Sequence, residues 1–365
     1  MASIKKRPDG KWRARYRDPS GKERARHFER RVDAEQWITS VEHSKLRGAY
    51  IDPAAGKVTL RTYAERWRVA QVHRPSTAVQ VEGNLRKHVY PTLGERPLVS
   101  IRPSEVQAWV RGLTDKLAPA TVELIYRYLA SVLRAAVADR LIVRTPCEGV
   151  KLPKQNRPQV EPLPVEGVEA LVDAMPGRYR AMVILAAGTG LRQGECFGLT
   201  VDRVDFLRRS LMVDRQLSLV SGDVPKLAPP KTEASIRRVP LPAVVVDALA
   251  RHLADFQPGE DGLVFTSQRG EPIRRPRFSD DWRPAVARAG LPVGTRFHDL
   301  RHFYASLLIR HGESVKVVQA RLGHASAAET LDTYSHLWPD SEDQTRAAVD
   351  AVLGRGTDPL RSASR

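Results

Sequence analysis

Polar and apolar residues alternate most strictly near the start of the chain, where Lys11–Arg17 has the sequence KWRARYR. A period of two is typical of a strand with one buried and one exposed face. Turn-forming residues precede and follow this run, so we expect it to form a three-stranded sheet with short strands at 3–6 and 22–28. A helix from about Val32 to Leu46 would cover the face that carries the apolar side chains of Trp12, Ala14 and Tyr16.

Helical spacing dominates residues 57–150, where apolar positions recur every three to four residues. We expect Ser76 and Ser104 to cap two of these helices, and Pro91 to end one of them. The expected helices are 60–70, 76–90, 103–113 and 120–140. This region is therefore predicted to be a small all-α domain.

A segment rich in proline and charged residues, 151–164, has the composition of an extended linker. Beyond it the pattern is mixed, and we expect helices and strands to alternate before helices dominate from Ala243 onward. The expected helices are 165–175, 179–187, 192–199 and 341–353, and the expected strands are 210–217, 223–226 and 237–240. This second region is predicted to be mainly α-helical, with a small antiparallel sheet.

These patterns together predict a multi-domain fold. Its parts are a small three-stranded β-sheet plus helix at 1–55, an all-α domain at 57–150, the linker at 151–164, a mixed, mainly-α domain with a small antiparallel β-sheet at 165–353, and a disordered tail at 354–365.

The only feature of the composition that indicates a class of partner is its charge. The chain has 59 Lys and Arg against 42 Asp and Glu, a net charge of +17, which favours a polyanionic partner such as nucleic acid. The alternative is a generally basic protein whose charge has no such partner. Only two cysteines occur and they are far apart, so we expect neither disulfides nor a zinc site. With no signal peptide and no run of ~20 apolar residues, we expect a cytoplasmic protein without a membrane partner.

The first domain carries a large share of this charge. Residues 1–50 contain 14 Lys and Arg against 7 Asp and Glu. The exposed face of the central strand would carry four cations, which suits a DNA groove, although a solvated charged surface is the simpler alternative. These candidate DNA-binding residues are Lys11, Arg13, Arg15 and Arg17.

Two candidate sites for an anion precede the last third of the chain. Gly188 and Gly190 permit a tight turn into a helix that begins near Arg192, where the helix dipole favours an anion. Glu195 lies one turn further on and could orient the guanidinium. Lys231 stands near the tip of a turn before a strand, a place where a lysine is usually only solvated.

Four further candidate residues, two histidines, an arginine and a tyrosine, fall within 37 positions in the last third of the chain. His298 and Arg301 are three apart in a helical stretch, so both can lie on one face. His324 follows a probable helix end, and Tyr334 comes ten residues later. This set suits a phosphodiester held by cations while an oxygen nucleophile attacks it, but alone it could equally serve a hydrolase or a binding site.

Together these motifs resemble those of the tyrosine recombinase (phage integrase) family. The matching segments, in order, are Gly190–Glu195 (GLRQGE), Lys231, His298–His302 (HDLRH), Leu322–His324 (LGH) and Leu331–His336 (LDTYSH). The resemblance is close over about 165–350. Residues 57–150 resemble the family's helical core-binding domain and 1–50 its arm-binding domain, both with weaker motifs.

The resemblance implies a role for each matching residue at the phosphate. Tyr334 would attack the scissile phosphodiester and form a 3′-phosphotyrosyl link. Arg192 and Arg301 would bind the non-bridging oxygens, His324 would donate a hydrogen bond to the phosphate, and Glu195 would support the arginines.

It also implies the proton transfers. Lys231 would protonate the departing 5′-oxygen, and His298 would assist proton transfer at the tyrosine. His302 and His336 match frequent family positions, and we interpret them as structural. No cofactor is implied, and no carboxylate cluster for a two-metal site accompanies these cations.

The function implied is site-specific recombination that integrates or excises a phage or other mobile element, independently of metal and ATP. The implied partners are double-stranded DNA attachment sites and three further copies of the chain in a tetramer on DNA, and the setting is a bacterial nucleoid. The sequence leaves open whether a directionality factor takes part. Two alternatives are a non-catalytic DNA-binding regulator derived from an integrase, and a topoisomerase-like enzyme with the same chemistry.

Overall fold

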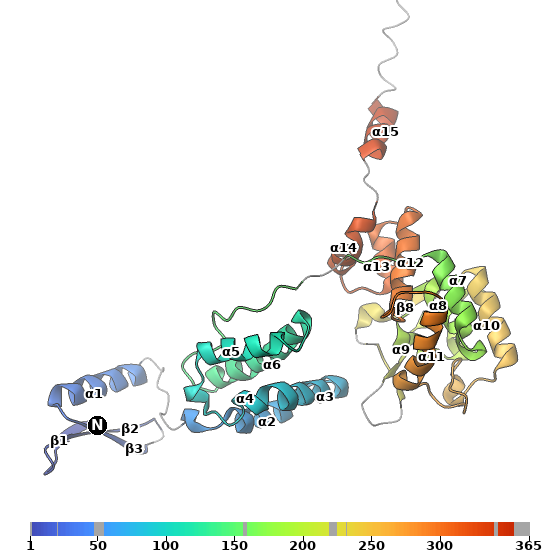
Figure 1. Ribbon diagram of the computed structural model, residues 1–365. Coiled ribbons are helices and arrows are strands. Elements are labelled where there is room, and N and C mark those ends of the chain that lie inside the picture. The colour runs from blue at the N-terminus through green and yellow to red at the C-terminus, as the bar shows by residue number, and fades with distance from the viewer. Residues whose placement is uncertain are drawn as a thin grey trace, which may run out of the picture. The chain divides into compact units, whose positions relative to one another are not determined.

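The computed structural model describes residues 2–19, 21–46, 55–155, 159–218, 225–230, 232–338 and 342–353. The chain divides into two compact units, 1–156 and 157–365. The first unit holds the N-terminal sheet and a bundle of helices, each with its own apolar core, and the second holds the remaining elements (Figure 1).

The N-terminal sheet has the predicted strands in the order β1-β2-β3, all antiparallel. Their bounds are β1 Ser3–Lys6, β2 Trp12–Arg17 and β3 Glu23–Phe28, and the helix α1 spans Arg31–Leu46. Helix α1 covers one face, where Tyr16 packs edge-on against Trp37 with 5.4 Å between ring centroids. The opposite face therefore keeps the alternate side chains of β2 in solvent, as the period of two predicts.

The helical part of the first unit surrounds one apolar core, of which Leu60, Leu85, Ile125 and Leu133 are fully buried members. Its elements are a 3-10 turn at Ala55–Lys57, α2 Leu60–Ala70, α3 Pro75–Asn84, a π-helical turn at Leu85–Val89, α4 Tyr90–Leu93, a 3-10 turn at Leu98–Ser100, α5 Pro103–Thr114 and α6 Pro119–Ala138.

Three local predictions in this part were wrong. Pro91 does not end its helix, because the π-helical turn before it changes the hydrogen-bond register and the chain continues to Leu93. Ser76 and Ser104 do not cap their helices. A proline precedes each serine and takes the first helical position, where a fixed φ and a missing N–H cost nothing, so the cap is the residue before the proline, Arg74 or Arg102.

The second unit is mainly helical. Its helices are α7 Val165–Ala174, α8 Gly177–Thr189, α9 Gln193–Phe197, α10 Ala243–Asp255, α11 Arg275–Arg288, α12 Asp299–Arg310, α13 Val315–Leu322, α14 Ala327–Tyr334 and α15 Glu342–Leu353, with 3-10 turns at Val201–Arg203, Glu233–Ser235, Glu260–Gly262 and Ser335–Leu337. Helix α8 lies among α7, α10 and α12 and is buried on nearly all sides (Figure 1).

Two small antiparallel sheets complete this unit. One has the order β4-β5-β8 and the other pairs β6 with β7. Their strands are β4 Val204–Asp205, β5 Ser210–Val213, β6 Gln216–Ser218, β7 Lys226–Ala228 and β8 Arg237–Pro240. The single strand expected at 210–217 is two strands of different sheets, separated by Asp214 and Arg215, whose side chains form ion pairs instead of continuing the ladder.

No helix in the described ranges is both long enough and apolar enough to cross a membrane.

Candidate active site

The turn between α8 and α9 presents Arg192 as its sequence predicts. Gly190 takes a left-handed conformation (φ 66°), and a Cβ atom there would meet the Tyr304 ring at 2.5 Å, so only glycine fits. The Glu195 carboxylate accepts hydrogen bonds from the Arg192 backbone N–H (2.9 Å) and from its guanidinium (3.0 Å). Burial acts to raise the pKa of Glu195, but Arg237 and Arg192 outweigh it and hold the pKa below its usual value. Glu195 is therefore a carboxylate that fixes Arg192.

Arg301, on the first turn of α12, is almost fully buried. Its guanidinium donates hydrogen bonds to the carbonyl oxygens of Gly190 (2.8 Å) and Leu322 (2.6 Å). Burial, with Arg192 nearby, lowers the pKa of Arg301 to about 9, so the group keeps its charge at neutral pH. A second arginine thus joins the glycine turn to the end of α13.

His298 and His324 are both neutral in this arrangement. His298 is the residue before α12 and lies on the wall of a cavity, where its ring keeps contact with solvent. Removal from bulk water, with the charges of Arg301 and Arg192, lowers the pKa of His298 to about 4 and that of His324 to about 3. The Nδ1 atom of His324 lies 2.9 Å from the Thr330 hydroxyl, which fixes the ring.

Tyr334, the last residue of α14, is buried in an apolar cluster with only 1% of its surface exposed. Burial raises the pKa of its phenol to about 12, although Arg301 opposes the change. The phenol oxygen lies 2.8 Å from Nδ1 of His302. Burial also lowers the pKa of His302, so the imidazole is neutral and its Nδ1 can accept the phenol proton.

The contact between His302 and the phenol was not expected from the sequence, from which we interpreted His302 as structural. That His298 assists proton transfer at the tyrosine stays a prediction. His302 lies on α12, one turn beyond His298, and the two rings are 4.9 Å apart. His336, the other histidine interpreted as structural, contacts the carbonyl oxygen of Val160 (2.9 Å).

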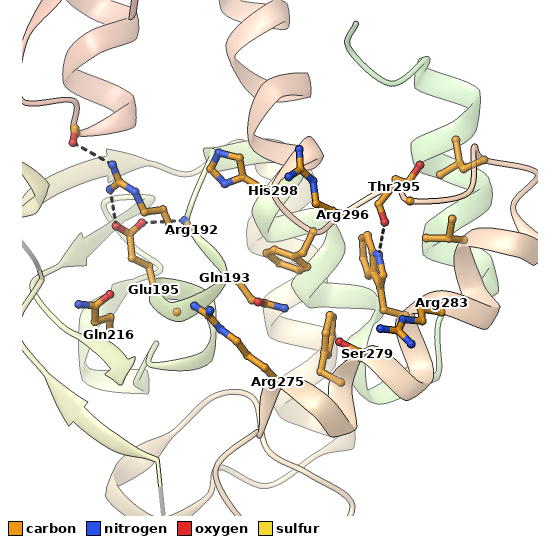
Figure 2. Close-up of a pocket in the computed structure, with 18 of the residues that line it drawn as sticks. Arg192, Gln193, Glu195, Gln216, Arg275, Ser279, Arg283, Thr295, Arg296 and His298 are labelled. Atoms are coloured by element: carbon orange, nitrogen blue, oxygen red, sulfur yellow. Dashed lines mark hydrogen bonds and ion pairs between the residues drawn. The ribbon is translucent and has the colours of Figure 1, made fainter. Parts of the chain in front are cut away.

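A cavity of about 1060 Å³ opens beside these groups, lined by Arg192 and His298 among others (Figure 2). Pro230 and Thr232 also line it. Lys231 lies between them but outside the described residues, so the structure places its neighbours and not the lysine itself. Figure 2 shows further arginines on the cavity wall, among them Arg275 and Arg296.

Arg237, the first residue of β8, is a buried charge beside this site that was not expected from the sequence. Its guanidinium donates to both carboxylate oxygens of Glu195, at 2.9 and 3.2 Å. A signal existed, because β8 alternates buried and exposed positions and Arg237 falls on a buried one. An arginine at such a position requires a buried partner.

The candidate DNA-binding residues lie on or beside the solvent face of the N-terminal sheet. Arg13 and Arg17 are exposed and Arg15 is half-buried, its Nε donating to the Ser3 hydroxyl (2.6 Å). This face also holds one acid, Glu23, opposite Arg17 and within 3.7 Å of both Arg13 and Arg15. Lys11, just before β2, pairs with Glu29. The face of the whole sheet is therefore basic but not uniformly so.

The chain is similar in sequence and in fold to several integrases. An integrase of Mycobacterium phage D29 is 28% identical over 341 residues, covering 89% of this chain and 90% of that one. The Tn1549 transposon integrase in complex with transposon right end DNA superposes with a TM-score of 0.70 at 24% identity, over 81% of this chain and all of that one. A lambda integrase tetramer bound to a Holliday junction gives 0.61 at 21% identity, over 93% and 98%.

Three family models match consecutive parts of the chain. They are the phage integrase N-terminal domain over residues 2–48, the phage integrase central domain over 58–152, and the phage integrase family over 162–340. The chain belongs to the phage integrase family of tyrosine-type site-specific recombinases.

Proposed function

We propose that this chain cuts and rejoins DNA at attachment sites, through a covalent bond between Tyr334 and a 3′-phosphate, to integrate or excise a phage or other mobile element. The general activity, site-specific DNA recombination by a tyrosine-type enzyme, follows from the family. The assignment of each step to a residue of this chain is our proposal.

Arg192 and Arg301 would bind the non-bridging oxygens of the scissile phosphate. Hydrogen bonds hold both guanidinium groups in place, that of Arg192 to Glu195 and that of Arg301 to two carbonyl oxygens. Their remaining donors are therefore preorganised for the charge of the transition state. His324, held by Thr330, would add a further hydrogen bond.

The phenol must lose its proton as it attacks. We assign the first acceptor to His302, whose Nδ1 atom contacts the phenol oxygen. His298, on the cavity wall and with its ring 4.9 Å from that of His302, would assist this proton transfer. Lys231 would protonate the 5′-oxygen that leaves, which balances the proton given up by Tyr334.

The single observation that carries this proposal is the convergence of the first turns of α9 and α12 on the end of α13. It brings Arg192, Arg301 and His324 together, although they are separated by more than 130 positions at the extremes. Cations held in fixed positions in this way suit the negative charge that develops on a phosphate in the transition state.

We assign the remaining regions as follows. Residues 1–55 would bind arm-type accessory DNA, 57–150 would bind the core site, and 151–164 would link them to the catalytic domain, 165–353, in a protein that acts in the cytoplasm on the nucleoid. The lambda integrase tetramer on a Holliday junction supports a tetramer of this chain on paired sites.

The test is covalent capture. Sheared DNA of the source genome is incubated with the chain, denatured in detergent, and the protein-linked fragments are recovered and sequenced to define the attachment site. Tyr334→Phe should retain specific binding to that site and form no adduct. The DNA end in the adduct should resist 3′-exonuclease, and the new 5′-end should accept phosphate from polynucleotide kinase.

The two alternatives give other results. A Tyr334→Phe variant that still forms the adduct would remove the proposed role of this tyrosine. A wild-type chain that binds the site but never forms an adduct would be a regulator. One that relaxes supercoiled DNA but recombines no pair of captured sites would be a topoisomerase-like enzyme.

A further inference from the structure

Three buried or half-buried arginines bond to three successive carbonyl oxygens at the end of α13. The pairs are Arg237 with Arg321 (2.8 Å), Arg301 with Leu322 (2.6 Å), and Arg192 with Gly323 (3.4 Å). The last carbonyls of a helix lack partners within the helix and carry the negative end of its dipole, so they attract cations. The end of α13 therefore aligns three guanidinium groups side by side.

Arg237 differs from the two phosphate-binding candidates in having no free face. Besides the Arg321 carbonyl and both oxygens of Glu195, its guanidinium donates to the Ser235 carbonyl (3.0 Å), and only 6% of its side chain is exposed. The side chain of Arg192 is 33% exposed and lines the cavity (Figure 2). A phosphate in the cavity could reach Arg192, while Arg237 would first have to leave its buried partners.

We propose that Arg237 is a positioning residue of the recombination site. Arg237 holds the Glu195 carboxylate near the end of α13, and Glu195 in turn orients Arg192. The same helix end accepts a hydrogen bond from Arg301. Because Arg237 is the first residue of β8, it also fixes this arrangement to that strand. This inference rests on the proposed function, since it concerns how the phosphate-binding arginines are kept in place.

The geometry requires an arginine. Arg237 donates two hydrogen bonds to one carboxylate and two more to carbonyl oxygens in different directions. Only a planar, forked guanidinium can make all of these bonds at once. A lysine at this position keeps the charge but can neither bridge both oxygens of Glu195 nor reach Arg321 at the same time.

The experiment compares two substrates on the same preparation of protein. Both are nicked duplexes bearing the captured attachment site. One has the natural scissile phosphate and the other a methylphosphonate, which lacks the negative charge that the arginines bind. The variants are Arg237→Lys and Arg237→Met, with Arg192→Lys as comparator. Arg238→Met is the matched control, because Arg238 is the exposed neighbour on the same strand.

We expect Arg237→Lys to bind the duplex with unchanged affinity and to cleave the phosphate about 100-fold more slowly, as when a preorganised donor is lost. On the methylphosphonate it should cleave within about tenfold of the wild-type rate, as Arg192→Lys should, because the charge to be neutralised is gone. Arg238→Met should match the wild type on both. Any loss of folded protein cancels in the ratio of the two rates.

Equal slowing on both substrates would show that Arg237 serves only the stability of the fold, and wild-type rates in Arg237→Lys and Arg237→Met would show that it serves neither. Either result overturns the inference. A wild-type chain without an adduct would instead contradict the proposed function itself.

Discussion

The environment of Tyr334 decides how its chemistry can begin. A phenol has a pKa near 10 in water, and burial raises that of Tyr334 to about 12, so the free enzyme holds a weak nucleophile. His302 is its hydrogen-bond partner, and the lowered pKa of His302 keeps the imidazole neutral at pH 7. The pair therefore has an acceptor ready for the proton before DNA is bound.

Replacing His302 with alanine should change the pH dependence of cleavage as well as its rate. In the wild type the rate should fall as the pH drops through the lowered pKa of His302, because the protonated ring cannot accept a proton. Without His302 the rate should fall about 100-fold or more and rise about tenfold per pH unit through the alkaline range, since the phenol must ionise unaided. Single-turnover cleavage from about pH 5 to about pH 9 measures this.

The matched control for that measurement is His336→Ala, which removes a nearby imidazole that bonds to Val160 and not to the phenol. Its profile should keep the wild-type shape. If His302→Ala also keeps that shape, the hydrogen bond to Tyr334 orients the phenol but takes no proton.

At the residue scale, a contact could be predicted from the sequence where both residues lie a few positions apart on one element. Glu195 supports Arg192 because the two are three apart at a helix start. The contact between His302 and Tyr334 spans 32 positions and depends on how α12 packs on α14, which no local pattern encodes. The alternation of β8 could have indicated that Arg237 is buried, but not its partners Glu195 and Arg321, which lie on α9 and α13.

At the scale of elements, the strand and helix patterns of the first 150 residues gave nearly the observed bounds. The errors occurred where neighbouring prolines compete with serines for the helix start, and where a π-helical turn lets a proline continue a helix. Both depend on hydrogen-bond register, which side-chain polarity does not report.

Helix α15 exposes apolar side chains that a second subunit could bury. Val349, Val352 and Leu353 are each at least half exposed, and a fully buried side chain of this kind contributes about 1.5 kcal/mol or more. We expect deletion of residues 341–365 to abolish assembly of the paired-site complex while leaving binding to a single half-site intact. Native gel mobility and sedimentation of the DNA complexes measure both.

Substitution of the same three residues by serine provides a milder version of that deletion. These positions face solvent in the single chain, so the variant should fold normally and still lose paired-site assembly. Unchanged assembly in both variants would mean that α15 packs on its own subunit or on nothing.

At the scale of the whole molecule, a net charge of +17 predicts binding that weakens steeply with salt. The N-terminal sheet presents arginines on one exposed face, whereas Arg192 and Arg301 are held in place by internal partners. Binding to accessory DNA and cleavage at the core site should therefore be separable.

Replacing Arg13, Arg15 and Arg17 with alanine should weaken binding to accessory DNA strongly while core-site cleavage stays near the wild-type rate. Each lost phosphate contact removes about one released counterion, so the slope of log affinity against log salt should fall by up to about three. Fluorescence anisotropy across a salt series measures the slope, and a suicide duplex carrying only the core site measures cleavage. Arg30→Ala with Arg31→Ala removes two charges at the N-terminal end of α1 in the same domain and should leave the slope nearly unchanged. Equal losses of accessory binding and core cleavage would mean that the sheet is not a separate DNA-binding surface, and that the basic face only steers DNA toward the catalytic domain.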